Sequence, residues 1–285
     1  MTASNVPSGG WVMWAGTVGF ATPVLERLEA TGQLDVQRFS VTPLDVEWAS
    51  ENGITARELG SRIRDAGYDV VIDPVVGWYG GVPHPGSRFG RFSSDDTIRM
   101  SAELGAVALN LIGQPTHDAS IDKLATCFAD VCDRAADFGA QAHLEFTPIT
   151  AITDLATGWD IVRAADRPNG GLLFDTWHFC KGTPDLALLE QIPGDRIFSV
   201  QISDARAITL PDVRQDTQHR ALPGDGVLDL VAIVRVLHRI GALTWVGPEV
   251  ISPELAALPT ATAAQLADAR TRDLLARATA DDLQP

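Results

Sequence analysis

Cysteine is scarce in this chain of 285 residues, and the three that it has, Cys127, Cys132 and Cys180, form no C-x-x-C pair. A sparse and odd number of cysteines excludes a disulfide framework, and the spacing of the first two is not that of a zinc knuckle. We therefore expect reduced thiols and a cytoplasmic protein. A signal peptide and a membrane span are not expected, because the N-terminus has no basic or apolar segment and no apolar run is long enough.

Positive charge is also scarce. The formal net charge is −15 at pH 7, which argues against nucleic acid and acidic membranes as partners. A Schiff-base aldolase is disfavoured, since the chain has only two lysines: Lys123 lies in a predicted helix and Lys181 lies beyond a strand end. No G-x-S-x-G, G-x-G-x-x-G or Walker motif follows a predicted strand, so a serine hydrolase and a nucleotide-binding sheet are not expected.

Short apolar runs alternate with longer amphipathic stretches along the whole chain. The apolar runs predict eight strands, over residues 11–15, 36–42, 69–76, 106–112, 140–146, 171–175, 197–202 and 244–251. The amphipathic stretches predict eight helices, over residues 22–31, 55–66, 94–105, 118–139, 154–166, 184–192, 227–241 and 260–281. Strands that alternate with helices form parallel βαβ units, so the pattern predicts an α/β protein with one domain, a (β/α)8 TIM barrel.

Capping residues set the predicted helix boundaries. Thr55 starts a capping box with Glu58, and Asp118 precedes the fourth helix. Glycines end several helices, as Gly105 does before the fourth strand. We expect residues 1–10 to be flexible and a C-terminal helix to cover 259–281, and one long loop, 204–226, follows the seventh strand. Long loops inside compact domains are usually functional.

Oxygen-bearing side chains lie at the ends of four consecutive strands, the fifth to the eighth. They are Glu145, Asp175, Gln201 and Glu249. Barrel enzymes place their chemistry at the C-terminal ends of the strands, so these four side chains should converge on one side of the mouth. Taken singly, each is a solvated or paired strand-end residue, but several carboxylates this close together cannot all ionise without a cation. The set predicts one divalent ion, Mn²⁺ or Mg²⁺ before Co²⁺ or Zn²⁺.

Other side chains near the strand ends are candidates for contact with a substrate. His178 follows Asp175 by three residues and could donate a proton or orient a hydroxyl, although a surface role is as frequent for such a histidine. His143 shares a strand face with Glu145, and a core position suits it equally. Trp14 and Trp177 follow strands and could line a pocket, but packing is the commoner role of aromatic residues there.

The motifs HLEF, FDTWHF, VQISDA, HRALPGDG and GPEV, in this order, resemble those of the sugar isomerase/epimerase superfamily with a xylose isomerase-like TIM barrel. The resemblance covers residues 12–255 and implies one such barrel over the whole chain, 1–285. It implies that Glu145 and Glu249 match the family's strand-5 and strand-8 glutamates, and that Arg220 matches the arginine before its Pro-Gly turn. Asp175 and His178 match its D-x-x-H pair.

Gln201 departs from the pattern, because many members of the superfamily have histidine there. Glutamine at this place resembles certain 3-dehydroshikimate dehydratases, and it gives a metal a neutral carbonyl oxygen instead of an imidazole. The substitution makes zinc a less suitable metal.

We expect a divalent-metal-dependent isomerase or epimerase acting on a small sugar or related polyol ketone, with Glu145 and Glu249 as proton carriers and His178 as a further catalytic group. Arg220, His143, Trp177 and Trp14 are the expected substrate-binding residues. Two alternatives stay open: a metal-dependent dehydratase of a β-hydroxy ketone such as 3-dehydroshikimate or an inosose, and a non-catalytic sugar-binding barrel. An endonuclease would need more histidine ligands and a basic face. A homo-oligomer is compatible with the sequence.

Overall fold

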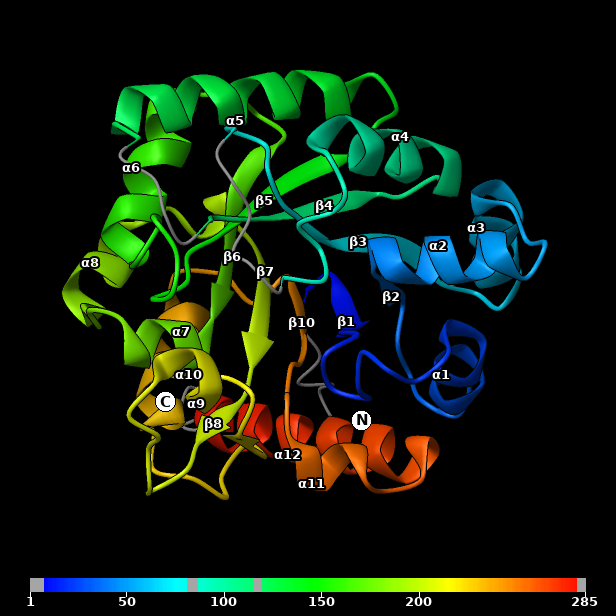
Figure 1. The fold of residues 1–285 in the computed structure, drawn as a ribbon. Coiled ribbons are helices and arrows are strands. Elements are labelled where there is room, and N and C mark those ends of the chain that lie inside the picture. Colours follow the sequence, from blue (N-terminus) through cyan, green and yellow to red (C-terminus); the bar gives the residue numbers. More distant parts are fainter. Residues whose placement is uncertain (1–7, 81–86, 115–118, 281–285) are drawn as a thin grey trace.

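The computed structural model describes residues 8–80, 87–114 and 119–280. Eight parallel strands close into a barrel in the order β1-β10-β7-β6-β5-β4-β3-β2, with the helices outside it (Figure 1). The strands are β1 (Gly10–Met13), β2 (Arg38–Val41), β3 (Asp69–Val75), β4 (Ala108–Ile112), β5 (Gln141–Glu145), β6 (Gly170–Asp175), β7 (Ile197–Ile202) and β10 (Trp245–Pro248). The predicted (β/α)8 barrel is confirmed, and all eight predicted strands are present.

The barrel closes where the first strand meets the last. Gly10 and Trp11 of β1 pair with Trp245 and Val246 of β10. A Cβ atom on Gly247 would lie 1.8 Å from the Val12 carbonyl oxygen, so glycine is required for this close approach. The expected flexible stretch 1–10 falls mostly on residues 1–7, outside the described residues, and Gly10 already belongs to β1.

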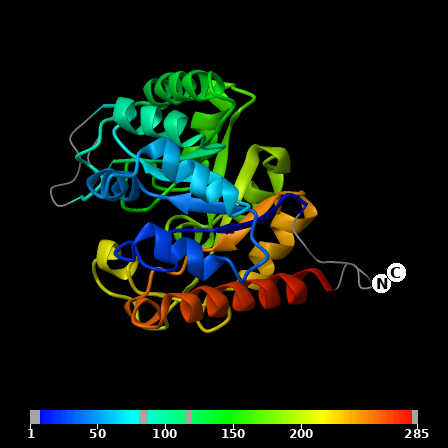
Figure 2. The same cartoon turned by 90° about the vertical axis from the view of Figure 1, so that its right-hand side faces the viewer.

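The helices of the outer layer follow the predicted order. They are α1 (Val24–Thr31), α3 (Ala56–Asp65), α4 (Ser94–Leu104), α5 (Ile121–Ala136), α6 (Leu155–Ala165), α8 (Leu186–Gln191), α10 (Leu230–Arg239) and α12 (Thr260–Thr279). Asp118 lies outside the described residues, and α5 begins instead after Ser120, whose side chain accepts a hydrogen bond from the Lys123 amide. Helix α12 packs on α1 and α10 along one side of the barrel, which ties the two ends of the chain together (Figure 2).

Four short helices were not predicted. They are α2 (Pro43–Glu51), α7 (Thr176–Lys181), α9 (Val213–Asp216) and α11 (Pro253–Ala256). The signals for α2 are present in the sequence, since Thr42 and Asp45 form a reciprocal capping box and Pro43 occupies the first turn. Helix α7 starts directly at the end of β6, so that its first residues lie at the mouth of the barrel.

The loop 204–226 is more ordered than a plain connection. It contains a two-stranded antiparallel ribbon, β8 (Asp204–Ala205) with β9 (Arg220–Ala221), as well as α9. The Asp204 carboxylate accepts hydrogen bonds from the backbone amides of Gly224, Gly226 and Leu228. Lys181 of α7 forms an ion pair of 2.8 Å with Asp216, which fixes α9 against the barrel mouth.

Candidate active site

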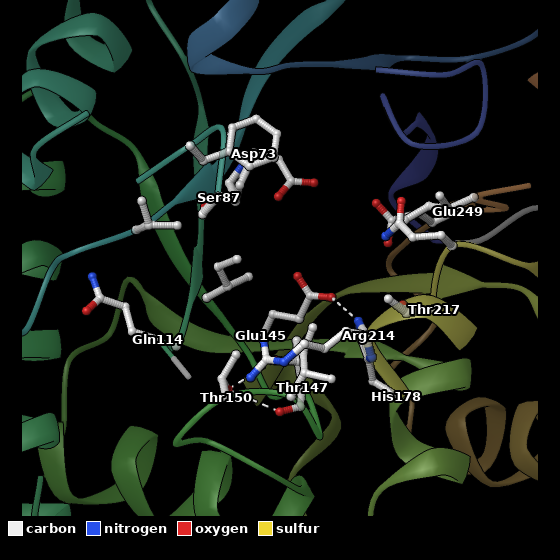
Figure 3. A pocket seen from close by; sticks show the side chains of 18 of the residues that line it. Asp73, Ser87, Gln114, Glu145, Thr147, Thr150, His178, Arg214, Thr217 and Glu249 are labelled. Atoms are coloured by element: carbon white, nitrogen blue, oxygen red, sulfur yellow. Dashed lines mark hydrogen bonds and ion pairs between the residues drawn. The ribbon is translucent and has the colours of Figure 1, made fainter. Parts of the chain in front are cut away.

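Four carboxylates gather at the C-terminal end of the barrel. Asp73 on β3, Glu145 on β5, Asp175 on β6 and Glu249 just after β10 are all almost completely buried as residues. Asp73, Glu145 and Glu249 line a cavity of about 440 Å³, and their side chains point into it (Figure 3). The cavity lining is largely apolar otherwise, apart from the side chains of Arg88 and Arg214, and we call the end of the cavity beside the carboxylates its floor.

Arg220 is the positive charge next to these carboxylates. Its Nη1 donates to Asp175 Oδ2 at 2.7 Å and lies 3.5 Å from Glu249 Oε2. The side chain is 1% exposed, and its guanidinium carbon lies 5.3 Å from the centre of the Trp177 ring. One arginine cannot neutralise four buried carboxylates, so the floor has an excess of negative charge when all of them are ionised.

This excess changes the acidity of the carboxyl groups. Burial, followed by the negative charges of Asp73 and Asp175, raises the pKa of Glu145 well above its usual range. Burial also raises the pKa of Glu249, against the opposing effect of Arg220. The pKa of Asp175 stays below its usual range, because its contacts with Arg220 and His178 outweigh the effect of burial. The two glutamates therefore hold a proton more readily than Asp175 does.

His178 lies on α7 and not in an open loop. The Asp175 side chain caps this helix by accepting a hydrogen bond of 2.9 Å from the His178 amide. The imidazole Nε2 lies 3.4 Å from Glu145 Oε1 and 3.2 Å from Arg220 Nη2. Burial is the main reason that the pKa of His178 falls to about 4, so the ring is neutral at pH 7 and available as a hydrogen-bond partner or a ligand.

Three side chains of this floor could hold a metal ion. Glu145, Asp175 and His178 each offer a ligand atom within 4.8 Å of the others. Gln201 of β7 is the register neighbour of Asp175, and both polar atoms of its fully buried amide lack a hydrogen-bond partner within the described residues. An orphaned amide beside a carboxylate cluster is costly unless a cation or water completes it, so these residues fit a divalent ion.

The structure brings together Glu145, Asp175, His178, Arg220 and Glu249 of the predicted site, with Gln201 beside them. It places the other three predicted residues elsewhere. Trp14, fully buried, packs with Val12 and Leu173 inside the barrel, and the His143 ring lies 5.4 Å from Phe198. The ring of Trp177 packs against the guanidinium group of Arg220. These three side chains are not among those that line the cavity, so we leave them out of the proposed substrate site.

Sequence reasoning missed two residues of the floor. Asn110 on β4 donates from Nδ2 to Asp73 Oδ1 and to Glu145 Oε2, each at 2.7 Å. Asp73 carries the same signal that identified Glu145, a carboxylate inside an apolar strand. Burial, with the Asn110 hydrogen bond opposing it, raises the pKa of Asp73 to about 7.

The chain matches the family model of the xylose isomerase-like TIM barrel over residues 28–272. It belongs to this family. A solved structure described as IolI protein with a binding zinc atom superposes with a TM-score of 0.79, at 20% identity, over 94% of this chain and 98% of that one. A structure of L-ribulose 3-epimerase superposes with a TM-score of 0.67 at 17% identity, over 96% and 99% of the two chains.

Curated relatives match parts of this family member. An inosose isomerase of Bacillus subtilis is 27% identical over 169 residues, which cover 59% of this chain and 59% of the relative. A 3-dehydroshikimate dehydratase of Pseudomonas putida is 29% identical over 102 residues, 36% of this chain and 16% of the relative. The matches thus span from about a sixth to under two thirds of these relatives' length. Within the described residues, no helix is long and apolar enough to cross a membrane.

Proposed function

We propose that this protein is a divalent-metal-dependent isomerase or epimerase of a polyhydroxylated ketone of the inosose or sugar type. The observation that carries the proposal is the floor of the cavity, where Glu145 and Glu249 meet around Asp175, Arg220 and the orphaned amide of Gln201. Relatives that include inosose isomerases and the structural likeness to sugar epimerases support it. A purely sugar-binding barrel would have no need for two glutamates with raised pKa values.

Glu145, Asp175, Gln201 and Glu249 would hold the metal, with His178 as a further ligand candidate. A bound divalent ion supplies Lewis acidity that polarises a carbonyl and its neighbouring hydroxyl. The oxygen-rich donor set favours Mn²⁺ and Mg²⁺ over Co²⁺ and Zn²⁺.

The two glutamates would move the proton. One carboxylate removes the proton from the carbon next to the substrate carbonyl, and the other returns a proton to the neighbouring or opposite position. Their raised pKa values favour this exchange, because a carboxyl group with a raised pKa is a stronger base when ionised and holds its proton more readily as an acid. Arg220 and His178 would hydrogen-bond the oxygen atoms on which negative charge develops.

A dehydratase is the second candidate, and Gln201 is the observation that favours it. Removal of the same proton followed by loss of a β-hydroxyl group would give an alkene and water. Glutamine on this strand resembles the dehydratases of the superfamily, and two 3-dehydroshikimate dehydratases are among the relatives. The same floor residues serve both reactions up to the proton abstraction.

Proton NMR in D₂O tests the proposal. The protein is stripped with a chelator, reloaded with each of the four metals, and incubated with an inosose or with 3-dehydroshikimate. We expect the hydrogen next to the inosose carbonyl to exchange for deuterium and an isomeric ketone to accumulate. New alkene signals would assign the dehydratase instead. If neither ketone exchanges although calorimetry shows that metal binds, both assignments are wrong.

A further inference from the structure

We propose that Asp73 binds a substrate hydroxyl group and that Asn110 is the positioning residue that orients both Asp73 and Glu145. The inference rests on the proposed function, because it assigns a specificity-determining contact within that same cavity. It adds a ligand class: a ketone with at least one hydroxyl group beyond the α-hydroxy ketone unit that reacts.

The geometry around Asn110 carries the positioning role. A primary amide nitrogen has two N–H groups, and here they reach Asp73 Oδ1 and Glu145 Oε2 at 2.7 Å each. All three residues are buried, and each lies on a different neighbouring strand, β3, β4 or β5. The amide therefore bridges two carboxylates that would otherwise repel each other. It also fixes the Glu145 carboxylate with Oε2 toward Asn110 and Oε1 toward His178.

Asp73 is left with one oxygen for a ligand. Its Oδ1 accepts a hydrogen bond from Asn110, whereas Oδ2 makes no hydrogen bond within the described part of the chain, and the side chain lines the cavity. Figure 3 shows Asp73 across the cavity from Glu249. Asp73 shares the Asn110 amide with Glu145 and is three strands away from Glu249 in barrel order, so a ring held at Glu145 and Glu249 would present to Asp73 a hydroxyl group on its Glu145 side.

A hydroxyl group is the donor that suits this position. Four carboxylates gather at the floor beside Arg220, and Arg88 and Arg214 also line the cavity. A neutral donor suits the place directly beside Asp73, because it adds no negative charge to these carboxylates. A carboxyl oxygen that accepts a hydrogen bond from a neutral hydroxyl binds it without adding charge, and the bond is strongest when the carboxyl group is ionised. The contact would select polyols over simple α-hydroxy ketones.

Kinetics with paired substrates tests the Asp73 contact. Asp73→Ala is assayed with scyllo-inosose and with deoxy-inososes that each lack one hydroxyl group. We expect KM for the complete inosose to rise about 10- to 100-fold, the loss of one hydrogen bond to a charged group, with kcat changed far less. One deoxy substrate should be insensitive to the substitution, because its missing hydroxyl group is the partner of Asp73. Equal sensitivity of every substrate, or none, would overturn the inference.

Asn110→Ala tests the positioning role. We expect kcat to fall more than KM rises, because Glu145 is no longer oriented, and we expect Asn110→Asp, which has the same size but no N–H donor, to be at least as impaired. Asp69→Asn is the control for the Asp73 and Asn110 substitutions: it removes a carboxylate from the exposed N-terminal end of β3, the strand of Asp73, and should leave both constants unchanged. An Asn110→Ala enzyme with normal kcat would remove Asn110 from the site.

A binding measurement separates this inference from the proposed chemistry. Calorimetry with scyllo-inositol, which cannot react as a ketone, reports ligand affinity, and a Mn²⁺ titration reports the metal. If the wild type binds the inositol and Asp73→Ala weakens that binding without weakening Mn²⁺, the contact stands even when no hydrogen exchange occurs. If the wild type exchanges hydrogen but Asp73→Ala changes neither binding nor KM, the contact is wrong and the proposed reaction is not.

Discussion

The two ends of the barrel interior both bury polar side chains, and they accommodate them in different ways. At the N-terminal end of the strands, Arg38 of β2 places its guanidinium carbon 3.6 Å from the Trp245 ring centre, and burial lowers its pKa to about 10. His143 lies against Phe198, and burial with the nearby charge of Arg38 lowers its pKa to about 3. At the C-terminal end, carboxylates share one arginine around a cavity.

The difference distinguishes buried polar residues that only stabilise the barrel from buried polar residues that take part in its chemistry. The N-terminal groups are neutral or stacked on aromatic rings, which stabilises them, and although Arg38 Nε and Nη1 and His143 Nδ1 lack a hydrogen-bond partner within the described residues, neither side chain lines the cavity. The C-terminal groups leave carboxylate oxygens facing open space and have pKa values shifted by one another. We therefore expect substitutions at the N-terminal end to change stability and substitutions at the C-terminal end to change activity.

Glu249→Gln is the strongest test of the C-terminal half of the comparison. The amide keeps the shape and one possible ligand oxygen but cannot accept a proton. We expect turnover to fall about 10²- to 10⁴-fold, without recovery in excess metal, and hydrogen exchange in D₂O to stop. An activity that returns at saturating metal would make Glu249 a ligand only, and an unchanged exchange rate would leave Glu145 or His178 as the base.

Trp245→Leu tests the N-terminal half. The change removes the ring from beneath Arg38 and leaves a buried guanidinium without its partner, so we expect a loss of about 2–4 kcal/mol in unfolding free energy. Denaturant unfolding followed by circular dichroism measures it. The remaining folded enzyme should keep kcat within about threefold, since Trp245 does not line the cavity. A large loss of kcat at unchanged stability would contradict the division between the two ends.

Gln201→His sharpens the description of the metal site. An imidazole is a softer ligand than an amide oxygen, so we expect the affinity for Zn²⁺ and Co²⁺ to rise relative to Mn²⁺, by about tenfold. Competitive metal titration measures the ratio. Identical relative affinities in the two proteins would place Gln201 outside the set of ligands.

Asp73→Asn gives the smallest expected effect, a pH-dependent change in the melting temperature of the metal-free protein. The folded-state pKa of Asp73 is raised from 3.8 to about 7, so its contribution to stability is complete below pH 3.8 and is lost as the pH rises to 7. Asparagine stays neutral throughout. The variant should therefore gain in melting temperature over the wild type at pH 8 compared with pH 5, and a constant difference between the two pH values would exclude this titration.

The sequence predicted the barrel and the carboxylates of three strands, Glu145, Asp175 and Glu249, because both depend on patterns that run along the chain. Alternating apolar and amphipathic stretches specify the βαβ units, and a carboxylate at the end of an apolar strand is conspicuous. Asp73 escaped although it shows the same signal. Asn110 has no such signal, because a neutral amide is informative only once its two carboxylate partners are known.

The sequence did not show how deep along the barrel axis each side chain lies. His143 lies on the same strand face as Glu145, yet two residues place it one layer deeper, where it meets Phe198 and not the cavity. Trp14 and Trp177 follow strands as predicted. Trp14, next to the closure of β1 against β10, is buried inside the barrel, and Trp177 on α7 is buried against Arg220. Such positions depend on strand register and shear, which are set only when the barrel closes.

The capping of α7 by Asp175 has a consequence for any attempt to redesign this protein. One oxygen of that carboxylate terminates a helix and the other holds Arg220. Evolution of a new activity can therefore alter Glu249 or Gln201, which cap no helix, at little cost to the scaffold, whereas a change at Asp175 would disturb folding and chemistry at once. Directed-evolution libraries that keep position 175 fixed and randomise 201 and 249 should retain far more folded members than libraries that include it.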